Sequence, residues 1–338
     1  MRASIRLGTW SIVGLAAACS STTNPPPVAS QTDASATDGG GPGPVIDGGK
    51  GSCPVLTHVT TATKLSLDAT WPASLAVSPG SDKVYIWLLS NYDIDSSNKV
   101  TGTTITCKNQ TPPITLNATG KIAVGAPSSG TAQVQIVIPT STWDKVNANG
   151  KGTSSVTGQI GGWNVGSSLY IAPSTSHAGL SPTSTFADPA TTWPAPNANG
   201  TAIPLTDVAD DDGDGHPGIT AIPSSDSGFY VPKTDLTGGL PTDRLYLVTR
   251  TELSLYGTST SCTEASGTAT VGQFNNHVVG CDIPGATDGG AGTDCVAAQY
   301  GFIDSNTTVY EVTSGTFQTK ELSTDGGGTC ADVLAALP

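Results

Sequence analysis

The stretch that decides the fold reads Lys64-Leu-Ser-Leu-Asp-Ala-Thr-Trp71. Polar and apolar residues alternate along it, and the apolar positions are Leu65, Leu67, Ala69 and Trp71. Successive side chains of an extended chain point to opposite faces, whereas a helix repeats its apolar positions every three to four residues. The stretch therefore predicts a β-strand with one buried face and one exposed face.

Strand patterns recur through the rest of the chain. Lys83–Leu89 is apolar on both faces, as in a central strand, Gln133–Ile138 alternates, and Arg244–Tyr256 is one long strand. Further short strands are predicted near residues 100–107, 113–118, 154–160, 167–172, 218–222, 266–274, 298–303, 307–313 and 316–322. Helices are predicted only for Ser141–Val146 and Cys330–Leu337. Many short strands separated by turn residues predict an all-β protein with little helix, an antiparallel barrel or sandwich.

Composition supports the same fold class and excludes some partners. Glutamate and methionine favour helices, and the chain has only four glutamates and one methionine. The formal net charge is −13, and a cleaved leader that carries Arg2 and Arg6 would take two positive charges with it. A surface with this much negative charge repels the phosphates of nucleic acids. No nucleic-acid partner is therefore expected. The acidity is compatible with divalent cations or with ordinary solubility.

The N-terminal residues have the pattern of an export signal. Arg2 and Arg6 precede an apolar run, Leu7–Ala18, which is shorter than the roughly 20 residues of a membrane-spanning helix. The sequence Leu15-Ala-Ala-Ala-Cys19 resembles the lipobox of bacterial lipoproteins, with alanine at the position where the family prefers leucine. The resemblance implies cleavage of a signal peptide, residues 1–18, and attachment of lipid to Cys19. The alternative is an ordinary secretory leader that is cut after one of the alanines.

A polar tether follows the predicted lipid anchor. Ser20 stands where lipoproteins of the inner membrane often carry aspartate, so the resemblance implies the outer membrane, periplasmic or surface-exposed. Residues 19–52 are rich in Ser, Thr, Pro, Gly and Asp and cannot bury a core, which predicts disorder. A flexible coil of this length spans about 30 Å on average. The expected all-β domain covers residues 53–338.

Six cysteines remain besides Cys19: Cys53, Cys107, Cys262, Cys281, Cys295 and Cys330. An even number in an exported chain predicts disulfides, and the absence of a C-x-x-C pair argues against a metal site. Fifteen pairings are open to six cysteines. Closeness in sequence favours Cys53–Cys107, Cys262–Cys281 and Cys295–Cys330.

Two short pieces of sequence recur. Thr70-Trp-Pro72 is repeated as Thr192-Trp-Pro194, and Asp82–Ile86 resembles Asp243–Leu247. One hypothesis is a duplication with halves at 53–185 and 186–338. The alternative is chance matching of strand-like segments.

The most distinctive loop reads Asp210-Asp-Asp-Gly-Asp-Gly-His216. Alternate carboxylates on a tight loop converge on one point, and Ca²⁺ takes six to eight oxygen ligands. The loop resembles the first half of a calcium loop of the EF-hand, dockerin or thrombospondin-repeat kind. The resemblance implies Ca²⁺ ligands from the following four residues: Asp210, Asp212, Asp214 and, through its backbone carbonyl, His216. The resemblance ends at the twelfth position of the calcium loop, where Ala221 replaces the bidentate glutamate. Asp207 or Asp226 would therefore have to contribute the missing carboxylate ligand. The alternative is a solvated acidic turn.

No motif of an enzyme family is convincing. The chain has no G-x-S-x-G, H-E-x-x-H, Walker or G-x-G-x-x-G sequence, and Ser96-Ser-Asn-Lys99 lacks its partner motifs. The histidines are scattered, and the tryptophans are expected mostly in the core. Lipobox and acidic loop together resemble uncharacterised bacterial surface lipoproteins, which imply no activity. The leading hypothesis is a non-enzymatic surface-binding or structural protein, and the alternatives are a hydrolase of polysaccharide or peptidoglycan and a carrier of small apolar ligands.

Overall fold

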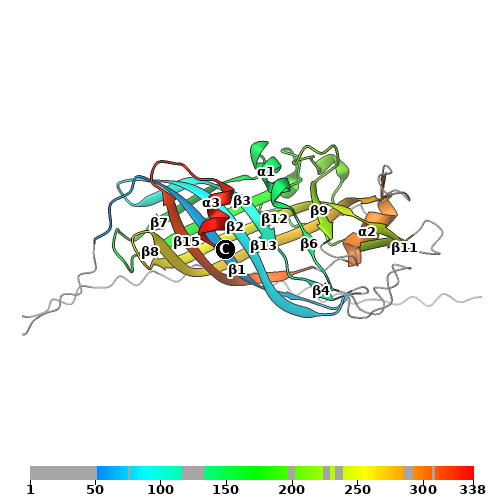
Figure 1. The fold of residues 1–338 in the computed structure, drawn as a ribbon, viewed down its shortest axis with the longest axis horizontal. Helices are drawn as coiled ribbons and strands as arrows, with labels where there is room; N and C mark the ends of the chain where they lie inside the picture. Colours follow the sequence, from blue (N-terminus) through cyan, green and yellow to red (C-terminus); the bar gives the residue numbers. More distant parts are fainter. Residues whose placement is uncertain are drawn as a thin grey trace, which may run out of the picture. The chain divides into compact units, whose positions relative to one another are not determined.

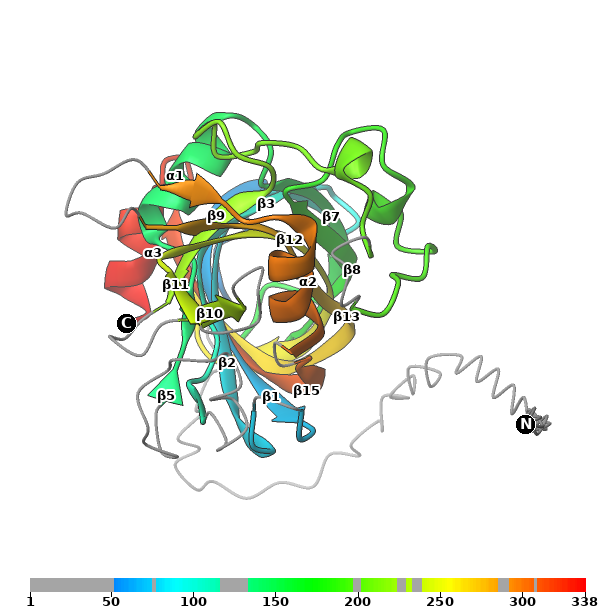
Figure 2. The same ribbon diagram turned by 90° about the vertical axis from the view of Figure 1, so that its right-hand side faces the viewer.

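Eight long antiparallel strands close into a ring within the described part of the chain (Figures 1 and 2). In ring order they are β1 (His58–Trp71), β2 (Gly80–Ile94), β3 (Lys99–Gln110), β7 (Thr153–Ile160), β8 (Ser168–Ala178), β12 (Arg244–Ser259), β13 (Glu264–Ile283) and β15 (Glu311–Ser323). The ring closes because β15 pairs with both β1 and β13. The all-β prediction is confirmed, and of its two alternatives the barrel is correct.

The computed structural model describes residues 52–74, 77–115, 133–196, 202–223, 229–232, 239–284, 292–306 and 309–338. The predicted signal peptide, Cys19 and all but the last residue of the predicted tether lie outside these ranges, as does Asp226. Within the described residues, no helix is long and apolar enough to cross a membrane.

Between β3 and β12, two different sets of strands complete the wall of the ring. Near its start, β3 pairs with β7, and β8 continues the wall to β12. At its other end, Gln110 pairs with β6 (Ile136–Val137), which leads through β9 (Ile219–Pro223) to Leu245–Leu247 of β12. Helix α1 (Thr140–Ala148) follows β6 and packs on β3 and β9. The ring is therefore closed by different strands at its two ends.

The remaining elements are short. They are β4 (Ile114–Thr115), β5 (Gln133–Val134), β10 (Phe229–Pro232), β11 (Gly239–Thr242), β14 (Thr293–Asp294), the 3-10 helices Thr185–Ala187 and Leu205–Asp207, and the helices α2 (Ala297–Asn306) and α3 (Cys330–Ala336). Helix α2 packs on β13 and lies at the end of the ring that faces the viewer in Figure 2.

Successive side chains of each strand point alternately to the inner and the outer face of the wall. Leu65 and Leu67 are fully buried and face the core of the ring, as predicted. The outer face of β1, β2 and β3 is also covered, because Trp87 and Leu89 pack against Val333 of α3. In a third apolar cluster, residues of the long β8–β9 connection cover the outer face of β12 and β13. The connection contributes Leu180, Trp193 and Ile203, and the two strands contribute Tyr246, Val248 and Val279. The central strands are therefore buried on both faces.

Both predicted helices are confirmed as α1 and α3, whereas the strand predicted at 298–303 is wrong. This segment lies within α2, where Tyr300 and Ile303 are buried one helical turn apart. A short apolar run is compatible with a strand or a buried helix, and here packing against β13 selects the helix. The strand predicted at 307–313 begins only at Glu311.

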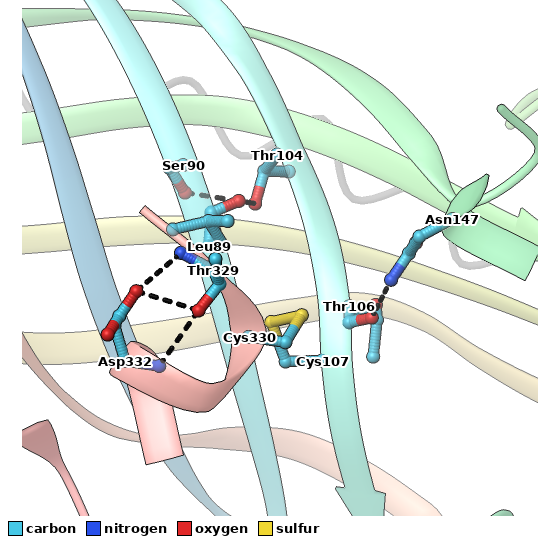
Figure 3. The surroundings of a disulfide bond; sticks show 9 residues. All are labelled: Leu89, Ser90, Thr104, Thr106, Cys107, Asn147, Thr329, Cys330 and Asp332. Carbon is cyan, nitrogen blue, oxygen red and sulfur yellow. Dashed lines mark hydrogen bonds between the residues drawn. A yellow bond between two sulfur atoms is a disulfide. The ribbon is translucent and has the colours of Figure 1, made fainter. Parts of the chain in front are cut away.

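Three disulfides are present, as the even number of cysteines predicted, but the predicted pairing is wrong. The bonds join Cys53 to Cys262, Cys107 to Cys330 and Cys281 to Cys295. The first two span 209 and 223 residues, because ring closure brings the chain's distant parts together. Figure 3 shows the second bond, which ties α3 to the outer face of β3. Closeness in sequence is no guide where the closing strands are far apart.

The two Thr-Trp-Pro sequences lie in different settings. Trp71 is in the last position of β1 and belongs to the core inside the ring, whereas Trp193 lies in the β8–β9 connection and packs outside it. The duplication hypothesis remains a prediction.

Candidate functional site

The acidic loop brings three carboxylates together. One oxygen from each of Asp210, Asp212 and Asp214 lies within 4.8 Å of the others, so the group could hold a metal ion. The Asp210 carboxylate shapes the loop by accepting hydrogen bonds from three backbone N–H groups, those of Gly213, Asp214 and Gly215, at 2.7, 3.1 and 2.9 Å. Both glycines have positive φ, of 68° and 92°, which permits the sharp turn.

Asp212 is the buried member of this group, with 4% of its surface exposed. Its Oδ2 accepts a hydrogen bond from the Thr220 backbone N–H at 3.0 Å, and its Oδ1 has no hydrogen-bond partner among the described residues. Burial, and after it the charges of Asp214 and Asp210, raise the pKa of Asp212. A buried carboxylate beside two others is costly unless a cation balances the charge.

Around these carboxylates, the structure places the other predicted ligands as follows. The imidazole of His216 stacks on Tyr246, with ring centroids 4.5 Å apart, so only the backbone carbonyl is left for the predicted role. Asp207 does not belong to the converging group. Ala221 is fully buried in β9, but its neighbour Thr220 donates its hydroxyl to Asp214 Oδ2 at 2.5 Å. Sequence reasoning missed Thr220 because the calcium-loop pattern assigns no ligand to that position.

The loop is also attached to the wall of the ring. Asp211 is 1% exposed, and its Oδ2 accepts a hydrogen bond from the Gly179 N–H at 2.6 Å. Burial raises the pKa of Asp211. A Cβ at Gly218 would lie 2.6 Å from the Leu247 carbonyl oxygen, so only glycine permits this close approach to β12. Because Ile219 begins β9, the loop positions a strand that closes the ring.

A second candidate site is a cavity inside the ring at its other end. It has a volume of about 130 Å³ and opens to solvent. Besides Trp163 and Ala265, nine larger aliphatic or phenyl side chains line it: Leu56, Val59, Ile94, Val100, Ile160, Leu169, Ile171, Leu255 and Phe317. Polar side chains enter from β1, β2 and β15, among them Thr61, Tyr92 and Glu321. Burial raises the pKa of the Tyr92 hydroxyl, against hydrogen bonds from Ser90 and Thr61.

The first described residues lie at the opening of this cavity. The Cys53–Cys262 disulfide lines the cavity, and the Cys53 N–H donates to the Trp163 carbonyl at 2.6 Å. Trp163 also lines the cavity and donates its indole N–H to Asn98 Oδ1 at 3.1 Å. At the rim, Glu264 forms an ion pair with Lys320, N to O distance 3.8 Å. The segment before β1 is thus fixed across the opening.

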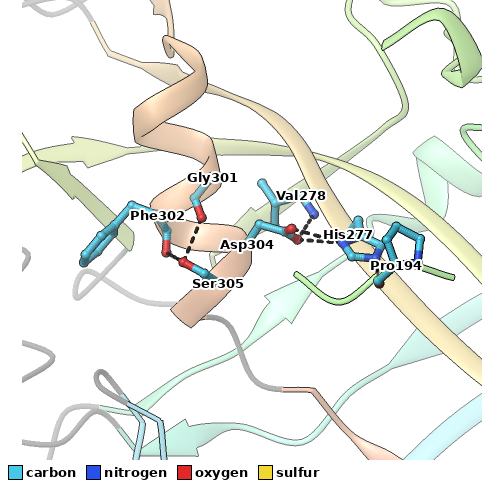
Figure 4. A network of polar contacts seen from close by, with 7 residues as sticks. All are labelled: Pro194, His277, Val278, Gly301, Phe302, Asp304 and Ser305. Atoms are coloured by element: carbon cyan, nitrogen blue, oxygen red, sulfur yellow. Dashed lines mark hydrogen bonds and ion pairs between the residues drawn. The ribbon is translucent and has the colours of Figure 1, made fainter. Parts of the chain in front are cut away.

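A buried histidine–aspartate pair lies between α2 and β13 (Figure 4). His277 Nδ1 lies 3.0 Å from Asp304 Oδ2, and its Nε2 lies 3.0 Å from the Pro194 carbonyl oxygen. Asp304 also accepts a hydrogen bond from the Val278 N–H at 2.8 Å. The imidazole stacks on Trp193, and no hydroxyl or thiol is bonded to it in the described part of the chain. The pair therefore connects α2 and β13 with the β8–β9 connection, to which Pro194 belongs.

The tryptophans follow the expectation of core positions. Four are buried, with at most 7% exposed: Trp71, Trp87, Trp143 and Trp193. Trp163, at the cavity opening, is partly exposed. The Ser96-x-x-Lys99 sequence lies at the turn between β2 and β3, as its polar composition predicted.

Comparison with known proteins gives no relative: the sequence matches no protein-family model and no curated protein. The acidic loop and the cavity are therefore the observations from which a function can be inferred.

Proposed function

We propose that this protein is a non-enzymatic, lipid-anchored binding protein of the outer membrane that takes a small apolar group into the open end of its ring. The observation that carries the proposal is the cavity, which is lined by these nine aliphatic and phenyl side chains. Its volume, about 130 Å³, is close to that of the apolar cavity of about 150 Å³ that binds benzene in another protein. A cavity of this kind favours the carrier over the hydrolase.

The order of the predicted tether and the cavity along the chain supports a role at the cell envelope. Residues 19–52 are the predicted tether, and Cys53, the residue that follows, lines the cavity. A lipid on Cys19 would therefore attach the protein by the end that carries the opening. An apolar group that leaves the membrane would then meet the end of the ring that carries the opening first.

We also propose that the acidic loop binds Ca²⁺ in a structural role. Asp210, Asp212, Asp214 and the His216 carbonyl would supply the ligands, with Thr220 next to them. Hard oxygen donors on a tight loop suit Ca²⁺, and the ion would neutralise the buried Asp212 carboxylate. The bound ion would fix the loop that leads into β9.

The test of the binding proposal is a fluorescence titration of the purified full chain with N-phenyl-1-naphthylamine, a neutral apolar probe whose phenyl ring is of the size that the cavity accepts. Leu169 lies partly buried in the cavity lining, so Leu169→Trp should fill the space and weaken binding at least about tenfold. Thr258→Trp is the matched control, because Thr258 is exposed on β12 and does not line the cavity. Saturable binding that survives Leu169→Trp unchanged, or no saturable binding at all, would refute the proposal.

A further inference from the structure

One carboxylate shares the inner face of the ring at the cavity. On β15, Phe317 pairs with Leu65 and Thr319 with Thr63, and all four lie on the inner face. Residues two apart on a strand share a face, so Glu321, opposite Thr61, continues the row toward the opening. Glu321 lines the cavity and is partly buried.

The Glu321 carboxylate has no hydrogen bond or ion pair within the described residues, in contrast to the rim carboxylate of Glu264, which pairs with Lys320. None of the described residues that line the cavity is basic. Lys320, which precedes Glu321 in the chain, is paired with Glu264, and the formal charge of the whole chain is −13. The cavity opening is therefore a region of negative potential beside an apolar interior.

This arrangement discriminates between charged amphiphiles. An anionic head group would lie against the Glu321 carboxylate, and like charges that are partly withdrawn from water repel each other. A cationic head group would instead gain a charge-assisted contact. Trp163 and Tyr92 also line the cavity, and aromatic faces attract cations, quaternary ammonium groups among them.

We propose that the cavity selects amphipathic cations: the apolar part enters the ring, and an amine or quaternary ammonium group remains at the opening beside Glu321. The proposal rests on the proposed function and names the chemical class of its ligand. Glu321 sets the charge preference, and the apolar wall supplies the affinity that all amphiphiles of one chain length share.

The experiment is displacement of N-phenyl-1-naphthylamine from the purified full chain at neutral pH and low salt. The competitors are hexyltrimethylammonium, hexanol and hexanoate, whose six-carbon chains suit the volume of the cavity and which do not form micelles at the concentrations used. The cation should displace the probe at about one tenth of the concentration that the anion requires, and 0.5 M NaCl should reduce this ratio. Glu321→Gln should abolish the preference and leave hexanol unchanged. Glu311→Gln is the matched control and should retain the preference, because Glu311 is exposed on the same strand and does not line the cavity.

The outcomes separate this inference from the function on which it rests. If the probe binds but the three competitors act equally, or if Glu321→Gln keeps the preference while its thermal unfolding is unchanged, the selection for cations is refuted and the apolar cavity site stands. If the wild-type chain does not bind the probe, the proposed function itself fails.

Discussion

Asp212→Asn is expected to change the thermal stability in opposite directions with and without calcium. The three carboxylates lie within 4.8 Å of one another. Two unit charges at that distance repel by about 1 kcal/mol in water and about 3.5 kcal/mol at an effective dielectric constant of 20. Asp212 takes part in two of the three pairs. Because Asp210 is exposed, the value for water applies best, and removing the Asp212 charge from the ion-free loop should relieve about 2 kcal/mol.

In calcium the effect of Asp212→Asn on stability has the opposite sign, because the same substitution removes a ligand of the ion. An ion present at 100 times its Kd stabilises the folded state by about 2.7 kcal/mol. In a chain of this size 1 kcal/mol corresponds to about 2 °C in Tm. The wild type should therefore lose about 5 °C when EGTA replaces excess calcium, whereas Asp212→Asn should not respond to calcium and should unfold about 4 °C above the wild type in EGTA.

Differential scanning calorimetry of the purified protein in CaCl₂ and in EGTA measures both effects. Asparagine keeps the acceptor for the Thr220 N–H, so the comparison isolates the charge. Asp144→Asn is the control, because Asp144 is exposed on α1 and outside the converging group. A wild-type Tm that is the same in both buffers, or an Asp212→Asn variant that is destabilised equally in both, would refute the calcium site.

Two further predictions concern the elements that surround the ring. Replacing both cysteines of Cys281–Cys295 by serine opens a loop of only 14 residues and should lower the free energy of unfolding by about 3 kcal/mol. The same change in Cys107–Cys330, a loop of 223 residues, should lower it by about 5 kcal/mol. Urea unfolding measures both free energies, and equal losses would contradict the prediction. Hydrogen bonds from Thr329 lower the pKa of Asp332 in the capping box of α3, so this cap contributes above the ordinary pKa of aspartate, 3.8, and is lost as the pH falls through the lowered value. The protection factor of the Val333 amide, its exchange rate relative to an unstructured chain at the same pH, should therefore fall in acid in the wild type and be low at every pH in Asp332→Ala. Equal protection in both proteins at neutral pH would contradict the cap.

The local elements of this fold could be predicted from the sequence because their signals are local. The alternation around Leu65 and Leu67 gives the inner face of β1. The strand patterns give the positions of the long strands but not their lengths, since β2 runs over Gly80–Ile94 where Lys83–Leu89 was predicted. Helix α3 was predicted at Cys330–Leu337, and in the structure Thr329 caps it (Figure 3). Each of these features depends on neighbours within a few residues.

The closure of the ring could not be predicted, because it depends on contacts between distant residues. Leu65 on β1 pairs with Phe317 on β15, and no local pattern specifies that register. The disulfide pairing failed for the same reason. Helix α2 was missed because its apolar run is short enough to be compatible with a strand, and only its packing on β13 decides.

The candidate sites divide in the same way. The three carboxylates of the acidic loop are close in sequence, so their convergence could be expected from spacing alone. The cavity is assembled from side chains of β1, β2, β3, β7, β8, β12, β13 and β15 and from the loops at one end. Gly257 and Gly267 face each other, and a Cβ at Gly257 would lie 2.7 Å from Phe317 Cζ, so this glycine gives the Phe317 ring its place in the cavity wall. No sequence pattern marks such a space.

A crystal structure of the protein soaked with iodobenzene tests the binding proposal most directly, because the anomalous signal of iodine locates the ligand without reference to any assay. We expect one strong peak inside the ring, in contact with Ile171, Leu255 and Phe317, that disappears in Leu169→Trp. A ring interior without a peak, at a ligand concentration that labels other apolar surfaces, would contradict it.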